Sequence, residues 1–257
     1  MRSGDDPLAR AKALYEYPVT RERTEDMKRL LDRSAAETAA YAAVTELCRY
    51  LNRWDNEGPA ELERLEPIIR QALSYDPNFY LAHYAQGFLQ RARGAHQKAL
   101  DAFEETIKHA PPTFSRVFAQ KGEQLLYLGK FPECIGEVNR ALEINPNSQV
   151  RGYYYWVLGR AHFFQGDYET STQWLQRSIR AWPQVWYNRA YLIAAHALQK
   201  QDGAARRVRR AFDRQFEGYS LARVVRNEED ATPCDNPAVR EGRERFHEGL
   251  RLAGFSS

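Results

Sequence analysis

Residues 152–183 read GYYYWVLGRAHFFQGDYETSTQWLQRSIRAWP, and the fold can be predicted from them. Two amphipathic segments are separated at Gly166 and closed by a proline, a pattern that predicts one hairpin of two α-helices. Where two helices cross closely, a small residue is needed, and Gly159 supplies it in the first helix. Ser171 and Ser178 are the small residues expected at the crossing in the second helix.

The same pattern recurs towards the start of the chain. Pro77, Pro111, Pro146 and Pro183 close successive segments at intervals of 34, 35 and 37 residues. The phrases around these prolines, ALSYDPN, TIKHAPP, ALEINPN and SIRAWPQ, are alike. Self-similarity at such a period is the signature of a helical repeat protein, in which each repeat buries its apolar face against its neighbours.

These residues resemble the tetratricopeptide repeat (TPR), whose pattern has a large residue, a leucine-glycine pair, an aromatic, two small residues and a closing proline. In residues 152–183 those places are taken by Tyr155, Leu158, Gly159, Tyr168, Ser171, Ser178 and Pro183, with Leu175 between the two small residues. Gln86 and Lys121 replace the leucine in the two earlier repeats. The resemblance implies an all-α, right-handed α-solenoid of about five TPR hairpins.

We expect the chain to have three parts. N-terminal leader helices are predicted over 1–33, the TPR solenoid over 34–216, and a loop followed by a C-terminal capping helix over 217–257. Asn236 is expected to cap that last helix. A solenoid exposes an apolar end unless an atypical element covers it, and the last helix is the natural cover for the final hairpin.

Two local features depart from the repeat pattern. Pro67 lies inside the second helix of the first repeat, where it removes a hydrogen bond and predicts a kink or an interruption. The run NEEDATPCDN at 227–236 is expected to form a polar loop.

Two phrases carry a further resemblance. Residues 51–87, with LNRWDNEGPAELERLEPIIRQALSYDPNFYLAHYAQG, and residues 249–254, GLRLAG, are similar to parts of the TPR region of some bacterial class III adenylate cyclases and some winged-helix regulators. The resemblance covers about residues 35–254. It implies an accessory or sensory module of a signalling protein and does not imply cyclase activity. Whether the chain is a fragment of a larger signalling protein stays open.

Charge, cysteines and apolar runs indicate which partners and which cellular compartment to expect. The net charge of +3 is small against 37 basic and 34 acidic side chains, so it gives no reason to expect a nucleic-acid partner. Cys48, Cys134 and Cys234 are unevenly spaced, which favours reduced thiols, with Cys134 as a core residue. No apolar run matches a signal peptide or a membrane span, so a cytoplasmic protein that does not bind membranes is expected.

Catalytic and metal-binding patterns are missing from the sequence. The histidines form no His-x-x-x-His or HExxH pair, and there is no GxSxG, Walker or GxGxxG motif. We therefore expect a protein that is not an enzyme and that uses no metal or cofactor.

The concave side of the solenoid is the predicted place of function. In TPR proteins the first helix of each hairpin lines this side, through the second, fifth, ninth and twelfth positions of the repeat. The groove residues expected from this count are Tyr84, Phe88, Glu123, Tyr153, Trp156, Arg160, Phe163 and Tyr191. The Lys and Asn set of TPR clamps for a terminal carboxylate is missing, and aromatics with isolated charges are typical of protein interfaces. A protein or peptide partner is favoured, although several of these rings could instead pack between hairpins.

Two alternatives remain beside peptide binding. The concave pocket could hold a small molecule, as in a sensory module. The fifth hairpin also carries a basic patch of five arginines, Arg206, Arg207, Arg209, Arg210 and Arg214, which is either a solvated face or a site for an acidic partner or nucleic acid. Nucleic acid is disfavoured because no recognition motif accompanies the arginines. The identity of the partner, the oligomeric state and the pathway stay open.

Overall fold

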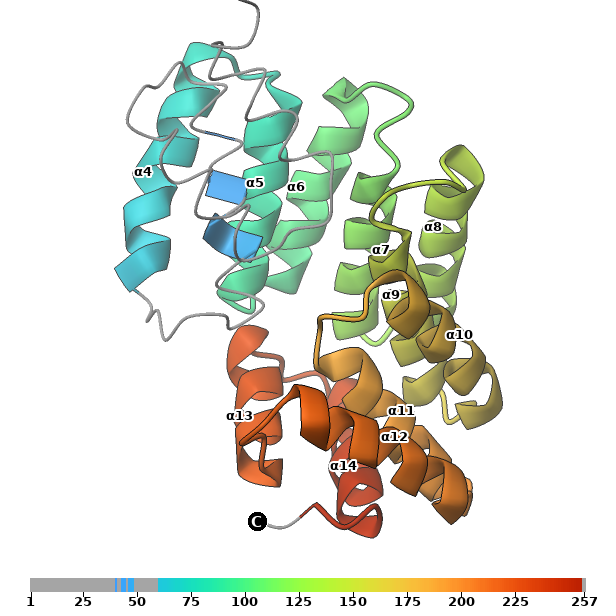
Figure 1. Cartoon of the computed structure of the whole chain (residues 1–257). Helices are drawn as coiled ribbons and strands as arrows, with labels where there is room; N and C mark the ends of the chain where they lie inside the picture. Colours follow the sequence, from blue (N-terminus) through green and yellow to red (C-terminus); the bar gives the residue numbers. More distant parts are fainter. Residues whose placement is uncertain (1–39, 41–42, 45, 49–59, 256–257) are drawn as a thin grey trace, which may run out of the picture. The chain divides into compact units, whose positions relative to one another are not determined.

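The structure is a computed structural model that describes residues 40, 43–44, 46–48 and 60–255. Every regular element within these ranges is an α-helix (Figure 1). The predicted leader helices over 1–33 lie outside the described residues, as does most of the first helix of the first repeat. The chain divides into two units, which are described one at a time.

Unit 1 contains residues up to Val117 together with residues 231–233. Its helices are α4 (Ala60–Tyr75), α5 (Tyr80–Ala92) and α6 (His96–His109). α5 and α6 form the second predicted hairpin, and α4 packs on α5 as the second helix of the first. The ring of His96 contacts the carbonyl oxygen of Pro233, at 2.8 Å, so the short segment 231–233 is fixed to this unit.

Pro67 does not interrupt α4, so of the two expected outcomes the interruption was wrong, and the kink stays a prediction. The proline is exposed, and so is Glu63, whose carbonyl group would have accepted the missing hydrogen bond. Water can satisfy a carbonyl on the exposed side of a helix, while Leu65 and Ile69 remain buried on the opposite side. The helix therefore tolerates the proline.

Unit 2 contains residues 118–230 and 234–257. Its helices are α7 (Arg116–Tyr127, which begins in unit 1), α8 (Phe131–Ile144), α9 (Arg151–Phe164), α10 (Tyr168–Ala181), α11 (Tyr187–Leu198), α12 (Asp202–Gln215), α13 (Leu221–Ala231) and α14 (Pro237–Leu252). The pairs α7–α8, α9–α10 and α11–α12 are the third, fourth and fifth predicted hairpins.

The predicted crossing of α9 and α10 is confirmed at Gly159. A Cβ at this residue would lie 2.7 Å from Cγ of Leu175, inside van der Waals contact. Ser171 donates a hydrogen bond to the carbonyl of Gly159 (2.7 Å), and Ser178 donates one to the carbonyl of Gly152 (2.8 Å). The small residues thus let the helices approach and also tie them together.

The same crossing recurs in the earlier hairpins. In unit 1 a Cβ at Gly87 would lie 2.4 Å from the ring of Phe103, and in unit 2 a Cβ at Gly122 would lie 2.8 Å from Val138. Each glycine faces the residue sixteen positions later, as Gly159 faces Leu175. The repeat in the sequence is therefore a repeat of one packing contact.

The C-terminal segment contains more helix than the sequence suggested. α13 continues to Ala231, so the loop predicted from residue 227 is wrong over its first half. Leu221, Val224 and Glu228 are buried on one face of α13, which explains why this charged run is helical. The cap of α14 is confirmed, because Asn236 Oδ1 accepts hydrogen bonds from the backbone N–H groups of Ala238 (3.0 Å) and Val239 (3.4 Å).

Cys134 was expected to be a core residue. Cys134 is fully buried between helices, and burial raises the pKa of its thiol, as expected for a core residue.

Among the helices that the structure describes, none is long and apolar enough to cross a membrane.

Replacing Gly159 by alanine should destabilise the protein by about 1–3 kcal/mol, because the new methyl group would overlap Leu175. Gly136 in α8 is the matched control, since no described atom lies within 4 Å of its Cβ position. Alanine there should instead stabilise the helix by about 0.5–1 kcal/mol. Urea unfolding measures both variants, and equal effects would show that the helices do not cross at Gly159.

Candidate interaction surface

The candidate surface lies on the first helices of the last two hairpins, α9 and α11. Trp156, Arg160 and Phe163 follow one another at spacings of four and three residues, so they share one face of α9. Tyr191 is the corresponding residue of α11. The ring of Tyr191 lies 5.1 Å from the rings of both Trp156 and Phe163. We call the face formed by these four residues the α9–α11 surface.

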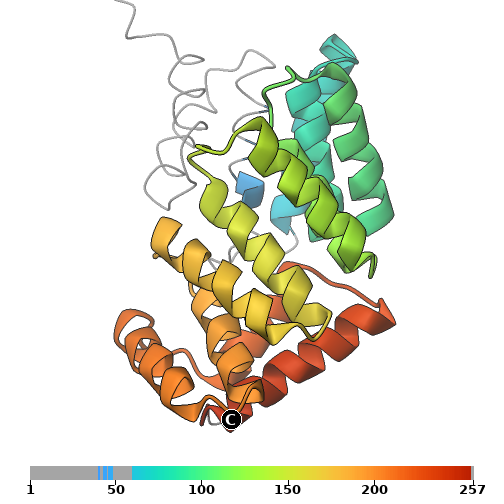
Figure 2. The same ribbon diagram turned by 90° about the vertical axis from the view of Figure 1, so that its right-hand side faces the viewer.

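The chain's own C-terminal helix packs on the α9–α11 surface at Phe163 and Tyr191. α14, red in Figure 2, packs on α11 and on α9. Its buried residues form one stripe: Val239, Gly242, Arg243, Phe246, Gly249 and Leu250. The rings of Phe246 and Tyr191 are stacked, with centroids 3.9 Å apart and planes inclined by 8°. α14 thus packs on the last hairpin, as a capping helix was expected to do, and also on α9 of the hairpin before it.

Two glycines of α14 allow its backbone to approach this surface. A Cβ at Gly242 would lie 2.7 Å from the ring of Phe164, and a Cβ at Gly249 would lie 2.7 Å from the carbonyl oxygen of Ala194. Arg245 donates a hydrogen bond to the carbonyl of Phe164 (2.6 Å). Phe246 is placed between the two points of close approach and is fully buried.

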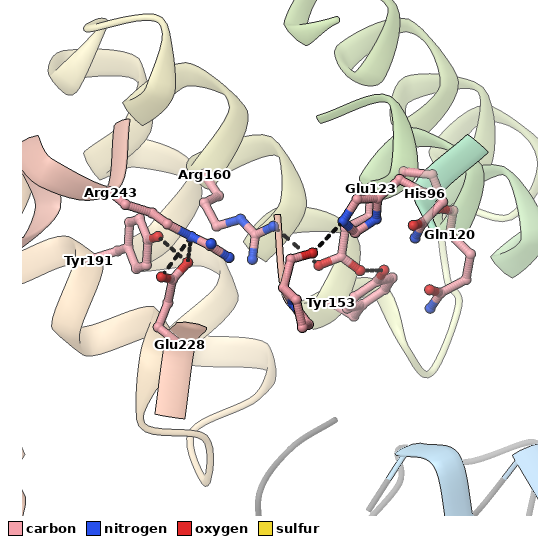
Figure 3. A network of polar contacts seen from close by, with 10 residues as sticks. His96, Gln120, Glu123, Tyr153, Arg160, Tyr191, Glu228 and Arg243 are labelled. Carbon is pink, nitrogen blue, oxygen red and sulfur yellow. Dashed lines mark hydrogen bonds and ion pairs between the residues drawn. The ribbon is translucent and has the colours of Figure 1, made fainter. Parts of the chain in front are cut away.

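A buried polar cluster joins α11, α13 and α14 (Figure 3). Glu228 accepts hydrogen bonds from the Tyr191 hydroxyl (3.2 Å) and from Arg243 Nε (3.1 Å), and its other oxygen lies 2.9 Å from the same nitrogen. Burial lowers the pKa of Arg243, but Glu228, Tyr127 and Tyr191 together outweigh this effect, and the pKa is raised. Burial and then the charge of Glu228 raise the pKa of Tyr191, so its phenol remains a donor.

A second polar cluster joins α7 and α9 (Figure 3). Arg160 forms an ion pair with Glu123 (3.5 Å), and the Tyr153 hydroxyl donates to Glu123 (2.5 Å). The guanidinium group of Arg160 also lies over the rings of Tyr127 (4.7 Å) and Trp156 (5.2 Å). The two charged residues predicted for the groove are therefore paired with each other inside unit 2.

The predicted groove residues of unit 1 belong to a separate aromatic cluster. Tyr84 and Phe88 of α5 are buried, with their ring centroids 5.0 Å apart. Tyr84 also contacts Phe103 and Phe114, at 5.6 and 5.2 Å. A continuous groove from Tyr84 to Tyr191 would span both units and stays a prediction.

The burial of the predicted groove residues limits which of them can contact a partner. Trp156 and Arg160 are 4% exposed and Tyr191 is 0% exposed, while Tyr153 is half-buried. In unit 2 these side chains pack against other helices of the chain, the alternative that the sequence left open. Phe163 and Tyr191 contact Phe246 of α14, so contact of these two residues with an external partner requires α14 to move away.

The sequence reasoning missed four residues of the C-terminal segment that complete the surface: Glu228, Gly242, Arg243 and Gly249. A signal was present, because Gly242 and Gly249 are seven residues apart and share a helix face with Phe246. Small residues on the apolar face of a terminal helix indicate close packing against another helix.

The five arginines of the basic patch are all on α12. Arg206, Arg207, Arg210 and Arg214 are exposed. Arg209 differs, because it forms an ion pair with Asp213 (2.7 Å) and lies over the ring of Phe255, 3.5 Å from its centroid. Four of the five are therefore available at the surface.

Solved structures with a similar fold identify the architecture. TTC0263, a thermophilic TPR protein of Thermus thermophilus, is 15% identical with a TM-score of 0.52, over 74% of this chain and 96% of that one. The fold is that of a TPR protein. PilW, a widely conserved type IV pilus biogenesis factor, is 18% identical with a TM-score of 0.61, over 82% of this chain and 94% of that one. PilF of Pseudomonas aeruginosa is 16% identical with a TM-score of 0.60, over 85% of this chain and 92% of that one.

No protein-family model and no curated protein matches the chain. The TPR assignment therefore rests on the repeated packing contact and on structural similarity.

Replacing Glu228 by glutamine should lower the free energy of unfolding by about 3 kcal/mol, because Arg243 is left buried without its counter-charge. Glu229→Gln is the matched control, since this neighbouring carboxylate is exposed and its loss should matter by less than about 0.5 kcal/mol. Thermal and urea unfolding measure both. Equal stability of the two variants would contradict the buried ion pair.

Proposed function

We propose that the chain is a non-enzymatic protein-interaction module of the TPR type, and that its α9–α11 surface binds a helical segment of a partner. The observation that carries this proposal is the position of α14, an amphipathic helix that packs on Phe163 and Tyr191, two of the residues predicted from the TPR pattern to contact a ligand. The chain's own helix is thus an intramolecular ligand of this surface.

The surface suits a helix for three physical reasons. Trp156, Phe163 and Tyr191 present a large and rigid apolar area, the kind of residue that dominates binding energy in protein interfaces. A helix with glycines on either side of an aromatic can approach closely, as α14 does at Gly242 and Gly249. An acceptor for the Tyr191 hydroxyl, as supplied by Glu228, completes the contact.

A partner would have to compete with α14. A tethered segment has a high effective concentration at its site, so a free helix binds only when it contacts the surface better or when α14 is first released. The partner's affinity is reduced by the small fraction of molecules in which the surface is open. The module would therefore bind weakly until a second event releases α14.

The charged groups of the surface support binding over catalysis. Within the described residues, Glu228 is paired with Arg243 and Glu123 is paired with Arg160, so these groups balance buried charges. The resemblance to the TPR region of class III adenylate cyclases and winged-helix regulators adds the proposal that the module regulates a signalling protein. A cytoplasmic location is part of the same proposal.

The test uses the full chain with a loosened C-terminal helix. A fluorescent peptide with the sequence of residues 235–255 should bind the Phe246→Ala chain at least about tenfold more tightly than it binds the parent. Truncation of a buried phenylalanine costs about 3–5 kcal/mol, which is enough to release α14 from the surface. Fluorescence anisotropy measures the affinity.

Two further variants make this experiment specific. Glu244→Ala, at an exposed position of the same helix, should leave peptide affinity at the parent level. Adding Tyr191→Ala to Phe246→Ala should abolish the gain, because the peptide then loses its stacking partner. If the folded Phe246→Ala chain binds the peptide no better than the parent, the α9–α11 surface is not a helix-binding site.

A further inference from the structure

The basic patch on α12 differs from three other charged helices among the described residues, α4, α6 and α14. In α4, α6 and α14 an arginine or lysine pairs with a glutamate three or four residues away, as in Glu66–Arg70, Glu105–Lys108 and Glu241–Arg245. On α12 only Arg209 has such a partner. Within the described residues, Arg206, Arg207, Arg210 and Arg214 form no ion pair.

Three of these arginines form a straight row. Arg206, Arg210 and Arg214 are four residues apart, so they lie on one side of the helix at intervals of about 6 Å along its axis. Arg207 lies beside the row. Like charges four residues apart destabilise a helix, and α12 keeps them although its acidic residues are only Asp202 and Asp213.

The row belongs to a surface separate from the α9–α11 surface. Arg206, Arg210 and Arg214 are exposed, whereas the side of α12 that packs into the unit carries Ala205 and Phe212. The end of α12 is fixed by Gln215, which donates a hydrogen bond to the carbonyl of Pro183 (2.9 Å). The arginine row therefore stands on a helix that packs into unit 2 through its opposite side.

We propose that Arg206, Arg210 and Arg214 form a docking site for an acidic helical segment of a protein partner. In such a segment, carboxylates at every fourth residue repeat at the same interval of about 6 Å, so each one can meet one guanidinium group. Arginine binds carboxylates with two parallel, charge-assisted hydrogen bonds, which gives the contact direction as well as strength. Electrostatic complementarity of this kind also speeds the first encounter of two proteins.

The aromatic rings near the row pack against one another, which favours a protein partner over single-stranded nucleic acid. Binding of single strands combines basic residues with exposed aromatic rings on which bases stack. The aromatic residues of this hairpin are engaged elsewhere: Phe212 is fully buried, and Phe216 packs on Phe212 and Tyr219. No aromatic side chain of α12 is free beside the arginine row in the described structure.

The experiment measures binding of two labelled helical peptides of about 20 residues to the full chain, one with glutamate and one with glutamine at every fourth position. The glutamate peptide should bind and the glutamine peptide should not. The triple variant Arg206→Gln, Arg210→Gln, Arg214→Gln should lose at least about tenfold in affinity, because three charge-assisted contacts are lost. Raising the salt from about 50 to about 200 mM should weaken binding to the parent.

The matched control removes the same charge elsewhere in unit 2. Arg151→Gln, Arg226→Gln, Arg240→Gln changes three exposed arginines and should bind the glutamate peptide within about twofold of the parent. Circular dichroism checks that both triple variants remain folded. The proposal is overturned if the glutamate peptide does not bind the parent at low salt, or if both triple variants lose affinity equally. It is also overturned if a single-stranded oligonucleotide binds through the same three arginines more tightly than the peptide does.

Discussion

The first helices of the last two hairpins have an apolar face that must be buried, and the C-terminal segment buries it. The stacked rings of Tyr191 and Phe246 are at the centre of this contact. Their close approach depends on Gly242 and Gly249, since larger side chains there would meet Phe164 and Ala194. A repeat protein must cover the faces that its repeats leave open, and here one helix covers both α9 and α11.

Most of the hairpin architecture could be predicted from the sequence because one packing contact recurs in it. Gly87, Gly122 and Gly159 each face the second helix sixteen residues later, and the closing prolines mark the ends of the hairpins. The extent of α13 was not predictable from its charged residues alone. A glutamate in a polar run looks like part of a loop, and only its buried contacts with Tyr191 and Arg243 explain why the run is helical.

The candidate site was predicted only in part, for a related reason. The repeat pattern identified Trp156, Phe163 and Tyr191 as residues of one face, because every hairpin has the same internal geometry. It contains no information on where a segment outside the repeats will pack. The ion pair of Glu228 with Arg243 cannot be predicted from the repeat pattern either, because both residues lie outside the repeats.

Hydrogen–deuterium exchange of residues 237–252 is the measurement that shows whether α14 is a ligand of the chain's own TPR surface. These amides should exchange at least about tenfold more slowly in the full chain than in the isolated peptide, because α14 is packed. An excess of free peptide with the sequence 235–255 should speed their exchange while leaving α10 unchanged. Exchange of residues 237–252 as fast as in the isolated peptide would contradict the account.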